Sequence, residues 1–159
     1  MKRVFLAIAL LVAAPTLGNG LRPFVRGSWQ KLRSAYRGQP LIVHFWGVSC
    51  APCMADLPDW ADLRKAPGDA AIVFVAADPE PVAQAAILDA LTRSGLGAAD
   101  CWMFADSFAE RLRYEVNPGW GGELPYTVLI TREGRVSTIS GVAGPEKIRD
   151  WLNRQAQLR

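Results

Sequence analysis

Residues 41–58 read LIVHFWGVSCAPCMADLP, and this stretch decides how the chain folds. It opens with a nearly continuous apolar run, residues 41–46, which is typical of a strand that is covered on both faces. The pattern after the turn predicts a helix, with Pro52 in the first helical turn, where a missing backbone N–H costs nothing. Cys50 is therefore expected at the exposed start of this helix and Cys53 one turn further in.

The position of the first cysteine favours redox chemistry. Unpaired backbone N–H groups and the positive end of the helix dipole stabilise an anion at a helix N-terminus, so Cys50 is expected to be the thiol that ionises more easily. A thiolate attacks disulfides, whereas a thiol does not. A Cys-x-x-Cys pair at a strand-to-helix turn is therefore interpreted as a redox dithiol.

Two other uses of the pair are a metal site and a purely structural disulfide. A metal site would usually bring two more Cys or His ligands at matching spacing. The whole chain offers only one further cysteine, Cys101, and one histidine, His44. A structural disulfide is seldom found at a helix start directly after a strand. Both alternatives are therefore less favoured than the redox interpretation.

Length and composition indicate one globular domain that does not bind nucleic acid. The chain has 159 residues, of which 50% are hydrophobic, which is enough for a single core. Its net charge of +3 falls by two if Lys2 and Arg3 are removed with a leader segment. The remaining basic residues are scattered among 15 acidic ones, so no basic patch for nucleic acid is expected.

Residues 1–18 have the order of a signal peptide: positive, apolar, small. The apolar run from Val4 to Ala14 is 11 residues long, short of the ~20 that a membrane-spanning helix needs. We expect export, with retention as an uncleaved anchor as the alternative. An exported protein meets an oxidising compartment, where a free dithiol persists only if something keeps reducing it.

The rest of the chain predicts an α/β domain over residues 38–159, preceded by an N-terminal extension over residues 19–37. Strand and helix patterns alternate, which indicates a central mixed sheet with helices on both faces. Besides the strand and helix described above, we expect strands at 71–77, 101–104, 126–130 and 135–140, and helices at 28–36, 82–94, 107–115 and 145–155. The helix at 107–115 should begin with a capping box at Ser107.

In this order, the motifs of the chain resemble the thioredoxin superfamily, and within it the TlpA-like exported thiol-disulfide oxidoreductases. The resemblance covers roughly Gly27 to the C-terminus. It rests on Gly38-Gln39-Pro40, Phe45-Trp46, Cys50-Ala51-Pro52-Cys53, Pro58 and Leu124-Pro125-Tyr126-Thr127.

The resemblance implies where a substrate binds. Pro125 matches the family's cis-proline, which lies against the dithiol and presents backbone to a substrate peptide. Trp46 and Leu124 are candidate substrate contacts on the same grounds. The loop 117–122, with Trp120 among glycines, would lie near this proline, either as a substrate contact or simply as a connection.

The spacing between the dithiol and this proline also carries information. Cys53 and Pro125 lie 72 positions apart, more than a minimal thioredoxin needs. The excess fits one extra helix-strand unit within residues 78–104, as in TlpA-like members. It leaves too little for the large helical insertion of the strong disulfide oxidants, which favours the reducing branch.

Several positions depart from the family or leave alternatives open. Ser49 stands where the family usually has an aromatic residue. His44 stands where a buried aspartate or asparagine is usual, and is either a proton relay for the resolving cysteine or a satisfied core histidine. Asp56 either tunes the dithiol or is an exposed carboxylate at a helix start. Cys101 is expected to be an inert buried thiol, with a regulatory role as the alternative.

The function expected from the sequence is that of an exported thiol-disulfide reductase. Cys50 attacks a substrate disulfide, Cys53 resolves the mixed disulfide, and His44, Asp56 or a water takes the proton. No cofactor or metal is needed, because the dithiol carries two electrons. The expected partners of this monomer are exported proteins bearing disulfides and a membrane-embedded thiol reductant. The alternatives are oxidase or isomerase action by the same dithiol, and a copper chaperone that uses both cysteines as ligands.

Overall fold

The computed structural model describes residues 20–66, 68–78 and 82–158. The predicted signal peptide, residues 1–18, lies outside the described residues. Within the described ranges, no helix is both long and apolar enough to cross a membrane.

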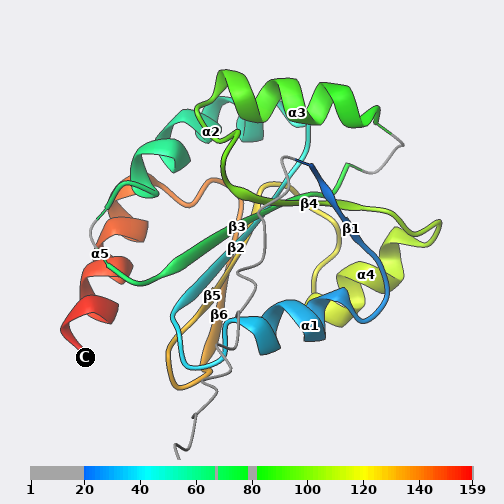
Figure 1. Ribbon diagram of the computed structural model, residues 1–159. Coiled ribbons are helices and arrows are strands. Elements are labelled where there is room, and N and C mark those ends of the chain that lie inside the picture. Colours follow the sequence, from blue (N-terminus) through cyan, green and yellow to red (C-terminus); the bar gives the residue numbers. More distant parts are fainter. Residues whose placement is uncertain (1–19, 67, 79–81, 159) are drawn as a thin grey trace, which may run out of the picture.

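The described residues form one six-stranded sheet with the strand order β1-β4-β3-β2-β5-β6 (Figure 1). The first four strands in this order run parallel, while β5 is antiparallel to β2 and β6 is antiparallel to β5. The predicted mixed sheet is thus confirmed. The strands are β1 (Arg22–Phe24), β2 (Leu41–Trp46), β3 (Ala71–Ala76), β4 (Asp100–Phe104), β5 (Tyr126–Ile130) and β6 (Val136–Ser140).

Helices cover both faces of the sheet (Figure 1). One face, called the α2 face here, packs against α2, α3 and α5, and the other, the α1 face, packs against α1 and α4. Each face has its own apolar cluster, as expected of a sheet between two helical layers. The helices are α1 (Ser28–Ala35), α2 (Ala51–Leu63), α3 (Gln84–Arg93), α4 (Ala109–Val116) and α5 (Pro145–Gln157).

Strand β2 lies in the middle of the sheet and is buried at every position. Because side chains alternate along a strand, Ile42, His44 and Trp46 face one way and Val43 and Phe45 the other. The first set lies on the α2 face and the second on the α1 face. A continuous apolar run in the sequence is therefore explained by two buried faces rather than one.

The extra helix-strand unit expected within residues 78–104 is present as α3 and β4. β4 pairs with β3 on one side and with β1 on the other. The unit therefore widens the sheet on the edge away from β5 and β6.

Two details differ from the expectations. Residues 22–24, placed in an N-terminal extension, form β1 and add an edge strand to the sheet, with Phe24 fully buried. The capping box at Ser107 does not form, because α4 begins only at Ala109 with Phe108 as its N-cap residue. The Asp106 carboxylate accepts the backbone N–H of Phe108 at 3.0 Å.

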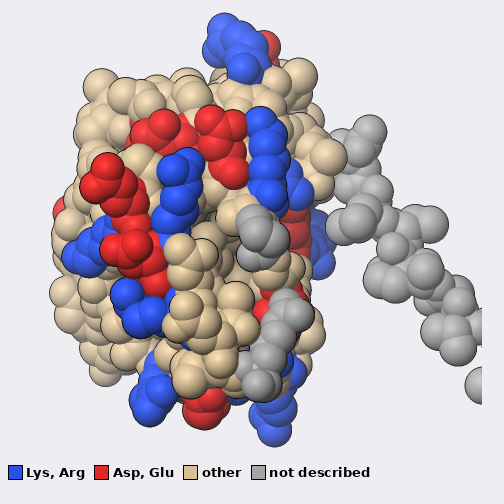
Figure 2. All heavy atoms as spheres, turned by 90° about the vertical axis from the view of Figure 1, so that its left-hand side faces the viewer, with Lys and Arg blue, Asp and Glu red and all other residues tan. Residues whose placement is uncertain are grey.

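Charged side chains of both signs are mixed on the molecule's surface. Figure 2 shows the side where α5 lies, and acidic and basic side chains are interspersed over it. This distribution agrees with the scattered charges in the sequence.

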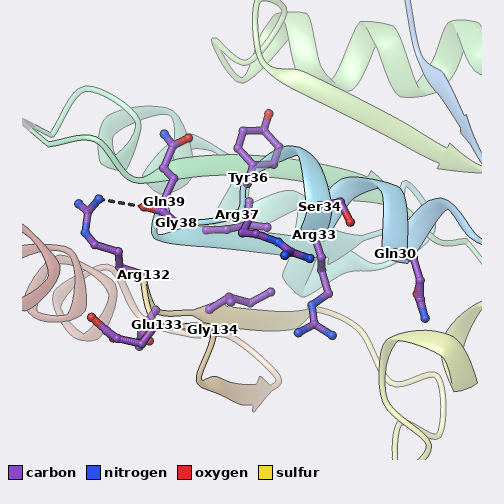
Figure 3. A pocket seen from close by; sticks show the side chains of 13 residues that line it. Gln30, Arg33, Ser34, Tyr36, Arg37, Gly38, Gln39, Arg132, Glu133 and Gly134 are labelled. Carbon is purple, nitrogen blue, oxygen red and sulfur yellow. Dashed lines mark hydrogen bonds between the residues drawn. The ribbon is translucent and has the colours of Figure 1, made fainter.

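A surface cleft of about 580 Å³ lies at the amino end of β2 (Figure 3). Leu41 and Ile130 belong to its lining, as do Arg33 and Arg37. Arg132 is held at its edge by a 2.9 Å hydrogen bond to the carbonyl oxygen of Gly38. No cysteine is among its lining residues, and the cysteine pair follows the other end of β2.

Candidate active site

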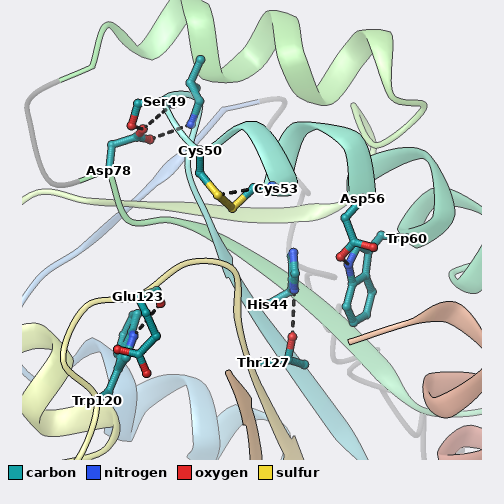
Figure 4. Close-up of a disulfide and its surroundings, with 11 residues drawn as sticks. His44, Ser49, Cys50, Cys53, Asp56, Trp60, Asp78, Trp120, Glu123 and Thr127 are labelled. Carbon is teal, nitrogen blue, oxygen red and sulfur yellow. Dashed lines mark hydrogen bonds between the residues drawn. A yellow bond between two sulfur atoms is a disulfide. The ribbon is translucent and has the colours of Figure 1, made fainter. Parts of the chain in front are cut away.

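Cys50 and Cys53 lie at the carboxyl end of β2, where α2 begins, and they are joined by a disulfide (Figure 4). Cys50 is the N-cap residue of α2, and its sulfur accepts the backbone N–H of Cys53 at 3.2 Å. Cys50 is partly exposed, whereas Cys53 is completely buried. The geometry therefore presents one sulfur to a partner molecule and keeps the other inside.

The turn before Cys50 is held by Asp78, two residues beyond the end of β3. Its carboxylate accepts the backbone N–H of Val48 at 3.0 Å and that of Ser49 at 2.9 Å. The Ser49 hydroxyl donates a third hydrogen bond to it at 2.8 Å (Figure 4). Parallel strands end at the same edge of a sheet, so β3 delivers this carboxylate directly beside the dithiol turn.

The proline segment leads into β5 and borders the same turn. The Leu124–Pro125 peptide bond is cis, the isomer that the resemblance implies. The side chain of Leu124 is partly exposed and packs close to Gly47, while Pro125 is buried. The carbonyl oxygen of Pro125 accepts the N–H of Gly141 at 2.8 Å, which anchors the start of β5.

Two tryptophans considered as substrate contacts are buried in the structure. Trp46 is completely buried on the α2 face. Trp120 is buried on the α1 face, where it stacks on Tyr126 with 4.6 Å between ring centroids. Its indole N–H donates to the carbonyl oxygen of Glu123 at 2.9 Å, so the loop 117–122 is fastened to the protein's interior.

His44 lies under the disulfide, between Thr127 and Cys53 (Figure 4). Its Nδ1 is 3.0 Å from Oγ1 of Thr127, a hydrogen bond whose direction depends on the tautomer. Its Nε2 is buried and has no partner among the described residues. Burial lowers the pKa of His44 to about 3, so the imidazole is neutral near physiological pH.

Asp56 is 6% exposed, so it is not the exposed helix-start carboxylate that the sequence left open as an alternative. The indole N–H of Trp60 donates to its Oδ2 at 2.8 Å. Burial raises the pKa of Asp56, against the smaller opposite effect of that hydrogen bond. Trp60 also contacts His44, with 4.3 Å between the ring centroids, so one indole touches both relay candidates.

Cys101 lies in β4 with a free thiol and is buried. Burial raises its pKa to about 12, which keeps it protonated and unreactive, as expected of an inert thiol. Across the described ranges, no group of three or more His, Cys, Asp or Glu side chains is placed to hold a metal ion.

Sequence reasoning missed three residues of this site: Asp78, Thr127 and Trp60. The sequence contained a signal for Asp78, because this residue directly follows the buried strand predicted at 71–77. That strand comes next after β2 in the alternation of strands and helices. Trp60 lies four residues after Asp56 on the same helix, which is the spacing of side-chain pairs on one helix face. Thr127 lies 83 positions from His44, and only the pairing of β2 with β5 brings them together.

Comparisons with known proteins identify the architecture. No family model and no curated protein matches the chain. Among solved structures, a thioredoxin-related protein from Neisseria meningitidis serogroup B is 22% identical, with a TM-score of 0.62 over 79% of this chain and 90% of its own. A secreted Mycobacterium tuberculosis disulfide oxidoreductase homologous to E. coli DsbE is 18% identical, with a TM-score of 0.59 over 78% and 85%. StoA from Bacillus subtilis is 23% identical, with a TM-score of 0.55 over 72% and 83%. The chain therefore has the thioredoxin fold.

Proposed function

We propose that this protein is an exported thiol-disulfide oxidoreductase that reduces disulfides in other exported proteins. The observation that carries the proposal is the asymmetry of the pair, a partly exposed Cys50 at a helix N-terminus bonded to a fully buried Cys53. An accessible thiolate can meet a substrate disulfide, and a buried thiol can then resolve the product.

The reaction starts from the reduced dithiol. The Cys50 thiolate attacks one sulfur of a substrate disulfide, forming a mixed disulfide and releasing the first substrate thiolate. Cys53 then loses its proton and attacks the Cys50 sulfur, which releases the second substrate thiolate. The enzyme is left with the Cys50–Cys53 disulfide, the bond seen in this structure. Two electrons pass to the substrate, and no cofactor is required.

The proton of Cys53 needs an acceptor in a buried place. His44 offers a neutral imidazole with a free Nε2 below the disulfide, but its lowered pKa makes it a weak base. Burial raises the pKa of Asp56, which makes its carboxylate a stronger base than an exposed carboxylate. We therefore propose that Asp56 accepts the proton of Cys53, directly or through a water. His44, held by Thr127, would keep the buried side chains below the disulfide in place.

Export is supported by the order of residues 1–18 and by the similarity to a protein described as secreted. In an oxidising compartment the spent disulfide must be reduced again, and a membrane-embedded thiol reductant would do so. The protein would act as a monomer, because a single chain supplies both cysteines and the proline segment.

Two cysteine variants test the proposal. Cys50→Ser is expected to abolish reduction of insulin disulfides by a thiol-recycled enzyme, because the attacking sulfur is lost. Cys53→Ser is expected to accumulate mixed disulfides with substrates, which electrophoresis without reductant would reveal. Normal turnover by Cys53→Ser would show that Cys53 is not the resolving residue.

The direction of electron flow is tested by the reduction potential. A value near that of thioredoxin, about −270 mV, supports a reductase, and a value near −120 mV supports an oxidant. Titration of the reduced protein with Cu(I) tests the remaining alternative. Tight stoichiometric binding without disulfide reductase activity would replace the proposal with a copper-binding role.

A further inference from the structure

Asp78 uses one carboxylate to bind three donors of the turn before Cys50. Oδ2 accepts the N–H of Val48, while Oδ1 accepts both the N–H and the hydroxyl of Ser49. Charge-assisted hydrogen bonds of this kind are stronger than neutral ones, so the turn is fixed from a neighbouring strand end. The hydroxyl of Ser49, at the position where the resemblance implies an aromatic side chain, adds one donor to this set.

Gly47 permits the close approach of this carboxylate. A Cβ atom at position 47 would lie 2.8 Å from Oδ1 of Asp78, closer than real Cβ contacts are found. It would also lie 3.2 Å from the Leu124 side chain. The segment Gly47-Val48-Ser49 therefore accommodates Asp78 in two ways. Gly47 leaves room for the carboxylate, and Val48 and Ser49 donate hydrogen bonds to it.

Two opposing electrostatic effects act on the ionisation of the Cys50 thiol. The N-terminus of α2 and the N–H of Cys53, 3.2 Å from the Cys50 sulfur, favour the thiolate. The carboxylate of Asp78 binds the backbone N–H and the hydroxyl of Ser49, the residue directly before Cys50 (Figure 4). A negative charge in this place disfavours a second one on the neighbouring sulfur.

We propose that Asp78 is a positioning residue that keeps this dithiol strongly reducing. Reduction of the disulfide takes two electrons and one proton, and yields a thiolate at Cys50 and a thiol at Cys53. A fixed negative charge beside Cys50 makes this reduced form less favourable relative to the disulfide. The dithiol therefore gives up its electrons more readily than the helix N-terminus alone would allow. This inference rests on the proposed function and gives a reason why electrons pass from the protein to the substrate rather than the reverse.

The experiment measures an equilibrium that needs no physiological substrate. The oxidised protein reacts with two glutathione molecules to give the dithiol and one glutathione disulfide, and the equilibrium constant is measured at pH 7. Asp78→Asn removes the charge and keeps one acceptor oxygen, while its NH2 group replaces the other acceptor. We expect it to shift the constant about tenfold toward the dithiol, which corresponds to about 30 mV.

Two variants separate charge from geometry. Asp78→Glu keeps the charge, and Ser49→Ala removes one hydrogen bond while leaving both backbone donors and the charge. The glutathione equilibrium constant of both variants is expected to stay within about threefold of that of the unmodified protein, because the charge beside Cys50 remains. The ultraviolet absorbance of the Cys50 thiolate, followed against pH, should show a lower titration midpoint in Asp78→Asn alone.

The inference is overturned if folded Asp78→Asn leaves the glutathione equilibrium constant and the midpoint of the thiolate titration unchanged. It is also overturned if Ser49→Ala shifts these two quantities as far as Asp78→Asn does. If Asp78→Asn does not fold, Asp78→Thr, which keeps an oxygen without the charge, takes its place under the same criteria. Insulin reduction is measured separately. A protein that fails to reduce insulin but responds to Asp78→Asn would refute the proposed function and leave the role of Asp78 standing.

Discussion

The two faces of the sheet are built from the same strands but differ in what they bury. The α1 face holds an almost entirely apolar cluster in which Phe45 packs against Phe24 and Trp120. The α2 face buries His44 and Asp56 next to the disulfide. Because side chains alternate along β2, the strand contributes apolar side chains to both clusters but a buried polar one, His44, only to the α2 face.

The largest effect is expected on the apolar side. Phe45→Ala should lower the free energy of unfolding by about 3–5 kcal/mol, because it leaves a cavity among packed rings. The glutathione equilibrium of the protein that remains folded should not change, since Phe45 faces away from the dithiol. Denaturant unfolding and the redox measurement check both statements.

Val136→Ala is the control for this variant, because Val136 lies on the edge strand β6 and is 49% exposed. It should change the free energy of unfolding by no more than about 0.5 kcal/mol. An equal loss of stability in both variants would mean that the α1 face is not the main source of stability at β2.

A pH-dependent loss of stability is expected from the polar side. Burial lowers the pKa of His44 to about 3, whereas a histidine in the unfolded chain has a pKa near 6.5. Below pH 6.5, His44 therefore binds a proton in the unfolded chain, whereas in the folded chain it stays neutral down to about pH 3. Stability from this group is complete above pH 6.5 and should fall by about 2 kcal/mol between pH 8 and pH 5.

His44→Asn isolates this contribution, because asparagine keeps a polar partner for Thr127 and does not titrate. The difference in unfolding free energy between the two proteins should narrow, or reverse, as the pH falls from 8 to 5. Parallel pH profiles would show that the imidazole is not held neutral.

The smallest effect is expected at Asp56. Asp56→Asn removes a buried carboxylate but keeps an oxygen for the indole N–H of Trp60. Because burial raises the pKa of Asp56, the ionised side chain costs stability once the pH exceeds that pKa. Asp56→Asn should therefore unfold at a higher temperature than the unmodified protein at pH 7, as thermal unfolding would show.

At a pH low enough to protonate Asp56, the two proteins should unfold at the same temperature. The variant should nonetheless resolve mixed disulfides more slowly at neutral pH, because its amide cannot accept the proton of Cys53. Unimpaired resolution by Asp56→Asn would transfer the role of proton acceptor to His44 or to water.

Local patterns predicted most of the fold but only part of the site. Strands and helices from residue 41 onward follow from apolar periodicity, and the spacing from Cys53 to Pro125 predicted the α3 and β4 unit. β1 was missed because three residues with a proline in the middle carry no periodic signal. They become a strand only through pairing with β4. Ser107 is not the N-cap residue, because α4 begins only at Ala109 and Phe108 takes the N-cap position.

Within the site, the cysteine pair could be predicted because both residues and the helix that positions them are contiguous. The burial of Asp56 and the partners of His44 could not, because they depend on which side chains the fold brings from elsewhere. Thr127 reaches His44 through strand pairing, and Asp78 reaches Ser49 because two parallel strands end together. The contact between Thr127 and His44 leaves no local pattern in the sequence, whereas the place of Asp78 directly after a predicted buried strand was a usable signal.

The short strand β1 sets a limit on how far the N-terminus can be trimmed. Its backbone pairs with β4, and the carbonyl oxygen of Phe24 accepts the N–H of Ala105 at 3.0 Å. The Phe24 ring stacks on Phe104 with 5.4 Å between centroids. A truncation that keeps the fold must therefore end before Arg22, since a chain beginning at Gly27 would expose the edge of β4 and leave a cavity in the α1 face.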